Sequence, residues 1–289
     1  MKTRSVVLMA VVALTLVTAG SARGAIPGGP LHHPSITAPA CRDYGAVGVT
    51  GVVTIPGVGE VSGVVASRIV QALWIEEDSG NPTTIYAIDP AGRKLATVQV
   101  GGATNRDWED IALASGRIWL ADIGDNSHTR TELQVYWFNE PSLSTTSVSA
   151  RLLTLRYADG VARNAEALVV DGDSKTLYIF TKESGTSRVF QASIRRLRGG
   201  ESKVLTQVAT LPLNKVTAAD LGPKGVIVKS GNGYLYRWTA DRQVLSALST
   251  APCSAPAGPG ESLAFSSDDR GLYAIPEGSS PSVYYTPHR

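Results

Sequence analysis

Histidine is scarce in this chain of 289 residues, and the scarcity limits the chemistry that the protein can perform. The four histidines are His32, His33, His128 and His288, and three of them lie near the chain ends. A Ser-His-Asp triad would have to use His128, and a zinc site rich in histidine cannot be assembled. We interpret His128 as a solvated loop residue and the His32-His33 pair as part of a solvated tail, rather than as metal ligands.

Cysteine is rarer still, since the chain has only Cys41 and Cys253. Two cysteines so far apart exclude the CxxC motif of redox chemistry. The sequence also contains no Gly-rich phosphate loop. In an oxidising compartment the simplest interpretation is a disulfide between Cys41 and Cys253, and two free buried thiols are the alternative.

The N-terminal segment predicts export. Two basic residues precede an apolar run at positions 6–16, and small residues follow at 18–22. This order is typical of a secretory signal peptide, and the apolar run is too short to span a membrane comfortably. We expect residues 1–22 to be removed by cleavage after Ala22, or after Ala25 as the second choice, which gives a secreted protein.

The mature chain lacks an excess of charge of either sign. Residues 1–22 contain two of the 27 basic side chains and none of the 25 acidic ones, so 25 of each sign remain. Nucleic acids and anionic membranes select proteins with a large basic excess. We therefore expect neither as a partner, and we expect an exported monomer that binds a small molecule or a cell-surface ligand.

Helical periodicity is scarce as well. Short apolar stretches rich in Val, Ile, Leu, Tyr and Trp recur between Gly, Asp, Asn and Ser, which is typical of an all-β fold. Residues 23–48 are rich in Pro, Gly, Ala and Thr and predict a lead-in arm with little structure. Residues 49–289 then form a single domain, of a size that is ordinary for a β-barrel or a β-propeller.

A repeat becomes visible when the acidic residues are aligned. Five segments share a small residue, a carboxylate and an apolar strand, and the five leading carboxylates are Glu60, Glu109, Glu166, Asp220 and Glu261. Two further strands follow each of them. Fourth strands are expected at 96–100, 151–156, 204–211 and 244–248. Repeats of about 40 to 50 residues with four strands each are typical of propeller blades.

The ends of the chain fit the same pattern. The fifth repeat ends after three strands, at Tyr285, and a strand at 51–56 precedes the first carboxylate. This N-terminal strand would complete the last blade and remove an open sheet edge, and a Cys41–Cys253 bridge would fasten it to that blade. We predict a five-bladed β-propeller closed by an N-terminal strand. Six blades are the alternative, because the long interval between Glu109 and Glu166 leaves room for further structure.

The repeat also predicts a site. In a four-stranded blade the innermost strand begins where the second strand ends, so each leading carboxylate should have a neighbour across its hairpin. The predicted neighbours are Glu77 or Asp78 for Glu60, Asp122 for Glu109, Lys182 for Glu166, Lys229 for Asp220 and Glu277 for Glu261. Three adjacent repeats would therefore present paired carboxylates, and the other two a carboxylate with a lysine.

Paired carboxylates are costly unless one is protonated or a cation lies between them. The acidic arc is therefore a candidate site for Ca²⁺, which prefers oxygen ligands. The candidate metal ligands are Glu109, Asp122, Asp125, Asn126, Asp78 and Glu277. The leading carboxylates together with Lys182 and Lys229, which are suited to an anionic group, are the candidate ligand-binding residues. The alternative is plain cross-strand ion pairs and carboxylates that accept hydrogen bonds from backbone amides.

Several motifs resemble one protein family. They are Asp107-Trp-Glu-Asp-Ile-Ala, Asp122-Ile-Gly-Asp-Asn with Arg130 downstream, Asn139-Glu-Pro, Asn164-Ala-Glu-Ala-Leu and Trp74 followed by Asp78-Ser-Gly. Over residues 58–185 they resemble secreted, largely actinobacterial β-propeller proteins with WEDIA and GDN signatures. The resemblance implies a fold and an exported location rather than a chemistry. A more distant likeness is to the calcium-dependent propeller phytases and their esterase-like relatives, which have six blades.

The primary functional hypothesis is a binding module that holds a cation and a small or cell-surface ligand at the acidic mouth. One alternative is a calcium-dependent hydrolase of phosphate esters, in which Ca²⁺ polarises a phosphoryl oxygen. Another is a glycosidase, which would need two carboxyl groups about 5 to 5.5 Å or about 6.5 to 9.5 Å apart beside a sugar cleft. Trp74 and Trp108 would then be sugar platforms, although both are interpreted more simply as core residues.

Overall fold

The structure is a computed structural model that describes residues 38–223, 225–238 and 244–289. The predicted signal peptide and the His32-His33 pair lie outside these residues. Within them nearly all regular structure is β, and the one helix is α1 (Val244–Leu248). No helix in the described part of the chain is long and apolar enough to cross a membrane. The prediction of an all-β fold is therefore confirmed.

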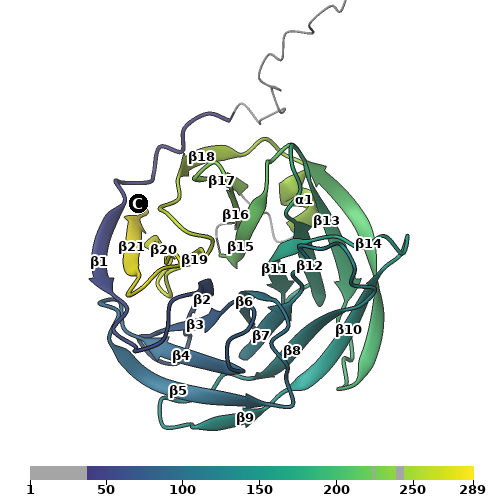
Figure 1. Cartoon of the computed structure of the whole chain (residues 1–289). Coiled ribbons are helices and arrows are strands. Elements are labelled where there is room, and N and C mark those ends of the chain that lie inside the picture. The colour runs from purple at the N-terminus through teal and green to yellow at the C-terminus, as the bar shows by residue number, and fades with distance from the viewer. Residues whose placement is uncertain (1–37, 224, 239–243) are drawn as a thin grey trace, which may run out of the picture. The chain divides into compact units, whose positions relative to one another are not determined.

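The strands form four hydrogen-bonded sheets arranged around a central axis (Figure 1). The first sheet contains β2 (Val61–Ala66), β3 (Leu73–Glu77), β4 (Thr84–Ile88), β5 (Lys94–Gly101) and β9 (Ser147–Ser149). The largest runs in the order β11 (Ala165–Asp171), β12 (Thr176–Thr181), β13 (Ser187–Ser193), β14 (Glu201–Leu211), β10 (Arg151–Tyr157), β8 (Leu133–Asn139), β7 (Arg117–Asp122) and β6 (Trp108–Ala114).

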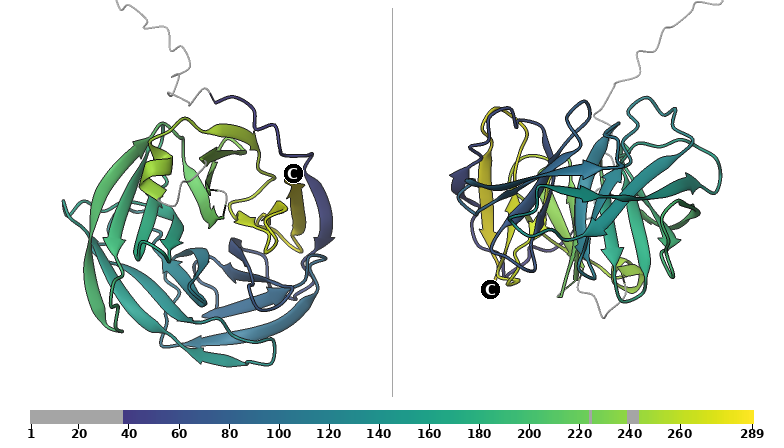
Figure 2. Two further views of the ribbon diagram at one scale, coloured as in Figure 1. Left: turned by 180° about the vertical axis from the view of Figure 1, so that it is seen from behind. Right: turned by 90° about the horizontal axis from the view of Figure 1, so that it is seen from below.

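The remaining two sheets have four strands each. One contains β15 (Val216–Gly222), β16 (Gly225–Ser230), β17 (Tyr234–Trp238) and β18 (Cys253–Pro256). The other contains β19 (Ala264–Phe265), β20 (Gly271–Ala274), β21 (Ser282–Pro287) and, from the N-terminal side, β1 (Gly48–Val52). Figure 2 shows the same arrangement from behind and from below.

The innermost strands close a ring. β2 contacts β6, β6 contacts β11, β11 contacts β15, β15 contacts β19, and β19 contacts β2. Their burial reflects this position, since every residue of β2 and β11 is buried, whereas the outer strand β5 buries Ala96, Val98 and Val100 in alternation with less buried residues. A strand that is packed on both faces is apolar along its whole length, whereas in a strand packed on one face apolar and polar residues alternate.

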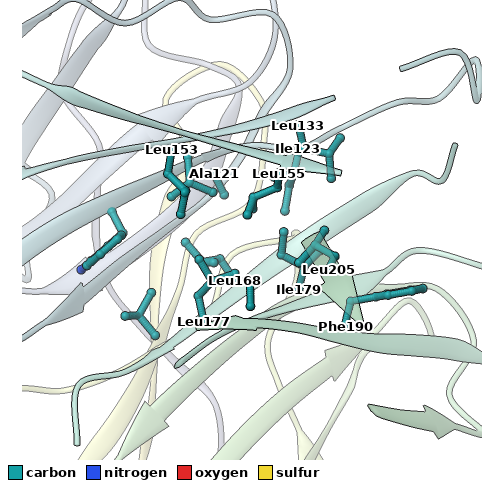
Figure 3. Packing of buried hydrophobic residues seen from close by; sticks show 14 of the residues in the cluster. Ala121, Ile123, Leu133, Leu153, Leu155, Leu168, Leu177, Ile179, Phe190 and Leu205 are labelled. Atoms are coloured by element: carbon teal, nitrogen blue, oxygen red, sulfur yellow. The ribbon is translucent and has the colours of Figure 1, made fainter. Parts of the chain in front are cut away.

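The eight-stranded sheet consists of two antiparallel halves joined by their outer strands. β10 and β14 pair in parallel, from Leu153 opposite Glu201 to Tyr157 opposite Leu205. Between the halves lies a buried apolar cluster to which both contribute, including Leu153, Leu155, Leu168 and Leu205 (Figure 3). Backbone pairing and side-chain packing therefore hold these two halves together.

The N-terminal closing strand is present. β1 pairs antiparallel with β21, from Gly48 opposite Tyr285 to Val52 opposite Ser282. The predicted range was 51–56, so the observed strand begins three residues earlier. Hydrogen bonding between an N-terminal and a C-terminal strand leaves fewer backbone groups at an open edge.

The predicted disulfide between Cys41 and Cys253 is also present, with a Cα–Cα distance of 5.0 Å. Its place differs from the prediction. Cys253 begins β18, so the bridge fastens the lead-in arm to the neighbouring four-stranded sheet rather than to the sheet that β1 completes. The arm pairs with β18 at the same point, where the Cys41 N–H donates to the Ser254 carbonyl at 2.8 Å.

The strand predicted at 244–248 is wrong, because these residues form α1. Val244, Ala247 and Leu248 are spaced for one face of a helix and are buried in a cluster with Trp238. Leu and Ala also favour helix over strand. The fourth strand of this sheet is instead β18, which pairs with β17.

Candidate functional site

Two of the leading carboxylates lie in β-bulges of innermost strands. The pairing of β6 with β7 shifts between Trp108 and Asp110, and that of β11 with β12 shifts between Ala165 and Ala167. Glu109 and Glu166 are therefore the extra residues, and a bulge turns the side chain of such a residue away from the regular alternation. The same shift recurs at Ser62 in β2 and at Thr217 in β15.

The carboxylates converge in two triads that share Glu109. Asp78, Asp107 and Glu109 form the first, and Glu109, Glu166 and Glu261 form the second. In each triad one oxygen from every residue lies within 4.8 Å of the others. We call this end of the ring the mouth. Three of the five leading carboxylates therefore meet there, together with Asp78.

Glu109 is the most isolated of these side chains. It is 3% exposed, and no hydrogen-bond donor reaches its carboxylate among the described residues. Burial raises its pKa, and the neighbouring Glu166, Asp78 and Asp107 raise it further. A buried carboxylate without a partner is unfavourable, so the ion-free site favours the protonated form of Glu109.

Gly124 provides the space in which this triad forms. A Cβ atom at this position would overlap Oε1 of Glu109 and Oδ2 of Asp107. The φ angle of Gly124 lies outside the left-handed region, so the requirement for glycine is one of volume rather than of backbone conformation. The two carboxylates therefore converge on a place that any other residue would fill.

Lys182 is the cationic member of the mouth. Its Nζ lies 2.5 Å from Oε2 of Glu166 and 2.9 Å from Oε1 of Glu261. The predicted proximity of Lys182 and Glu166 across the β11–β12 hairpin is confirmed. Burial opposes the charge of the lysine, but the two carboxylates outweigh that effect and raise its pKa.

The carboxylate of Asp122 pairs with Arg130 and belongs to neither triad. It is fully buried beside Glu109, and its Oδ1 accepts from Nη1 of Arg130 at 2.8 Å. It also accepts from the backbone N–H groups of Arg106 and Asp107. Asp122 thus positions the segment that presents Asp107.

Asp125 and Asn126 shape the adjoining loop. Asp125 accepts from the backbone N–H groups of Thr129 and Arg130, at 2.9 and 2.8 Å. Asn126 Oδ1 accepts from the side-chain amide of Asn164, which also donates to Glu166 at 3.1 Å. The GDN loop therefore reaches the second triad through Asn164.

Glu60 and Glu277 lie outside both triads and are exposed. Glu60 accepts from the Asn81 side chain at 2.7 Å, and its carbonyl accepts from the Asp78 N–H across the hairpin, as its predicted position required. Burial, with Glu261 and Asp78 nearby, raises the pKa of Glu277. Both side chains therefore contribute negative charge at the rim of the mouth.

The predicted pairing of Asp220 with Lys229 is wrong. The hairpin pairs Gly222 with Gly225, and this register places Asp220 opposite Ile227 and Lys229 opposite Ala218. Asp220 accepts instead from the backbone N–H groups of Leu221 and Phe265, and so ties β15 to β19. Lys229 Nζ donates to the carbonyls of Pro259 and Ser262, and burial lowers its pKa to about 7.

Three carboxyl groups near the axis were missed. Asp107 is two residues before Glu109, and this spacing was a usable signal. Asp110 accepts from the N–H groups of Ile111 and Leu168 and ties β6 to β11 as Asp220 ties β15 to β19. Glu76 is fully buried, and Gly63, whose Cβ would lie 2.6 Å from its Oε1, makes room for it. An alternation pattern does not reveal either contact.

A cavity of about 230 Å³ adjoins the first triad. Asp107 and Gly124 line it on the side of the triad, and Arg106, Ser79 and Thr129 contribute a guanidinium group and two hydroxyl groups. The mouth therefore combines clustered carboxylates with a small polar cavity.

No protein-family model matches the chain, and no curated protein matches it. Solved structures do. A gluconolactonase from Xanthomonas campestris is similar with a TM-score of 0.53 and 12% identity, over 89% of this chain and 94% of that one. A luciferin-regenerating enzyme (TM-score 0.44, 13% identity, 84% and 95% covered) and a nidogen/laminin complex (0.46, 11%, 75% and 72%) are also similar. At this identity the first likeness supports a propeller fold and no more.

Proposed function

We propose that this protein is an exported five-bladed β-propeller whose mouth binds Ca²⁺ through Asp78, Asp107 and Glu109. The ring of five innermost strands supports five blades, with the eight-stranded sheet as two of them. The disulfide fits an oxidising compartment. We further propose a monomer without a nucleic-acid or membrane partner, because the mature chain has no basic excess.

The Glu109 carboxylate is the observation that carries the cation proposal. It is buried, lacks a hydrogen-bond donor and faces Asp78 and Asp107. Burial, with Asp78 the next cause, also raises the pKa of Asp107. A hard divalent cation would compensate all three charges at once, and Ca²⁺ prefers such oxygen ligands. Asp78 and Asp107 are only half-buried, so an ion can reach them from solvent.

The polar cavity beside the triad is the proposed position of the second ligand. Waters or ligand oxygens would complete the coordination of an ion held by three carboxylates, since Ca²⁺ takes about six to eight oxygens. Arg106 is exposed and lies on the cavity wall, where it suits an anionic or strongly polar group. A small molecule or a cell-surface group with oxygen donors fits this arrangement.

Calcium titration tests the proposal. We expect Ca²⁺ to raise the melting temperature of the wild-type protein and calorimetry to detect its binding. Glu109→Gln removes the shared carboxylate and should weaken binding by at least about tenfold, or 1.4 kcal/mol. Asp173→Asn, which removes an exposed carboxylate in the turn between β11 and β12 and outside both triads, is the control and should bind as the wild type does. A melting temperature that does not respond to Ca²⁺ contradicts the proposal.

A metal-dependent hydrolase is the second candidate. The combination of clustered carboxylates with a polar cavity favours it, because a bound cation polarises a carbonyl or phosphoryl oxygen. The likeness to a gluconolactonase adds lactones to the substrates to be tested. Lactones, phosphate esters and aryl glycosides should be screened with and without Ca²⁺, with Glu109→Gln as the control. Turnover that is lost in this variant would make the protein an enzyme.

A further inference from the structure

The second carboxylate triad already contains a positive charge. Lys182 Nζ lies 2.5 Å from Glu166 and 2.9 Å from Glu261, both members of this triad. Calcium ions in proteins lie about 2.3 to 2.6 Å from their oxygen ligands. The ammonium nitrogen therefore occupies nearly the position that a metal ion would take between these two carboxylates.

We infer that Lys182 is the resident cation of the Glu109–Glu166–Glu261 triad and that it limits the mouth to one metal ion. The inference rests on the proposed function for the ion at the first triad. It assigns to the second triad a latent site for a divalent cation, which opens when the lysine is replaced by a neutral residue.

The backbone holds Lys182 at this place. The residue directly follows β12, and its N–H donates to the carbonyl of Asn164 at 3.0 Å. Asn164 in turn donates its side-chain amide to Glu166. Lys182 and Glu166, the two partners of the ion pair, are therefore held on one hairpin by these hydrogen bonds.

Charge supports the same stoichiometry. The two triads together contain five carboxylates, Asp78, Asp107, Glu109, Glu166 and Glu261, and Lys182 is the cation in contact with them. One divalent ion and the lysine supply three positive charges to the five negative ones. A second divalent ion beside the ammonium group would meet strong repulsion at short range. Without the lysine, the shared Glu109 and two further carboxylates are free for that ion.

The number of bound ions tests this inference. We expect calorimetry and metal analysis after dialysis to give one Ca²⁺ per wild-type chain and two per Lys182→Met chain. Lys215→Met removes an exposed lysine outside the triads and should remain at one. Lys182→Arg keeps the positive charge and should also remain at one. Lys182→Met combined with Glu261→Gln should lose the added ion.

The outcomes separate this inference from the proposed function. One ion in both the wild type and Lys182→Met overturns the inference and leaves the proposed site intact. No ion in the wild type but one in Lys182→Met overturns the proposed site and the limit of one ion per wild-type chain, and supports only the latent site at the second triad. No ion in either protein contradicts both. A Lys182→Met protein that has lost the cooperative melting of the wild type is replaced by Lys182→Gln, for which the same counts are expected.

Discussion

At the scale of single residues, the mouth depends on where side chains are absent as much as on where they are present. Glu109 and Asp107 approach each other over Gly124, and Glu76 fits beside Gly63. Each glycine faces a carboxyl group rather than an apolar side chain. The proposed cation site therefore requires glycine at position 124 as well as the acidic ligands.

Gly124→Ala should weaken Ca²⁺ binding by at least about tenfold, or 1.4 kcal/mol. The added methyl group overlaps Oε1 of Glu109 and Oδ2 of Asp107, so one or both carboxylates must move away from the triad. Calorimetric titration measures the change. Gly48→Ala is the control, because nothing lies within 4 Å of its Cβ position. Equal affinities for the two variants would show that Gly124 plays no part in the site.

The sequence predicted which carboxylates approach each other better than it predicted what each one does. Glu109, Glu166 and Glu261 were found because they recur at one position of the repeat, and recurrence is visible in a sequence. The roles of Asp122 and Asp125 were not predicted. Both accept hydrogen bonds from Arg130, which lies in a loop, and the conformation of a loop cannot be inferred from a repeating sequence pattern. Asp220 was misplaced because the predicted register of its hairpin was two residues off: the hairpin pairs Gly222 with Gly225, which puts Ile227 opposite Asp220.

At the scale of elements, alternation of apolar and polar residues predicts strands reliably, whereas a short apolar segment does not distinguish a strand from a helix. β14 shows this, because Leu205 is fully buried between the two halves of the eight-stranded sheet while Val204 beside it is 60% exposed. The segment 244–248 has no such alternation. Its three apolar residues suit one turn of helix equally well, and contact with Trp238 decides the outcome.

Leu205→Ala should lower the free energy of unfolding by about 2 to 5 kcal/mol, because it leaves a cavity among packed side chains. Val204→Ala on the same strand should change it by less than about 0.5 kcal/mol, since the side chain is in solvent. Denaturant unfolding monitored by circular dichroism measures both. If the two variants were equally stable, the register of β14 described above would be wrong.

At the scale of the whole molecule, the ring is closed by contacts between the two ends of the described chain. β1 pairs with β21, and the disulfide joins the arm to β18 across a sequence separation of 212 residues. A covalent link that closes so long a loop restricts the unfolded chain strongly. The closing strand itself was predictable, because the fifth repeat lacked a fourth strand.

Replacing Cys41 and Cys253 together by serine should lower the free energy of unfolding by about 2 to 5 kcal/mol. The wild-type protein treated with a reducing agent should show the same loss, whereas the serine variant should not respond to the reagent. Denaturant unfolding with and without the reductant measures this. An unchanged wild-type transition after verified reduction would mean that the arm contributes little to closure.

The parallel pairing of β10 with β14 has a consequence at the opposite edge of the sheet that contains it. β6 and β11, which carry Glu109 and Glu166, are the two ends of that one continuous sheet. The distance between these two carboxylates is therefore fixed within one sheet, whose end strands β6 and β11 also contact each other. Asp78 follows β3, in a different sheet, so any adjustment of the first triad to the radius of a bound ion falls to Asp78, while Glu109 keeps its distance from Glu166.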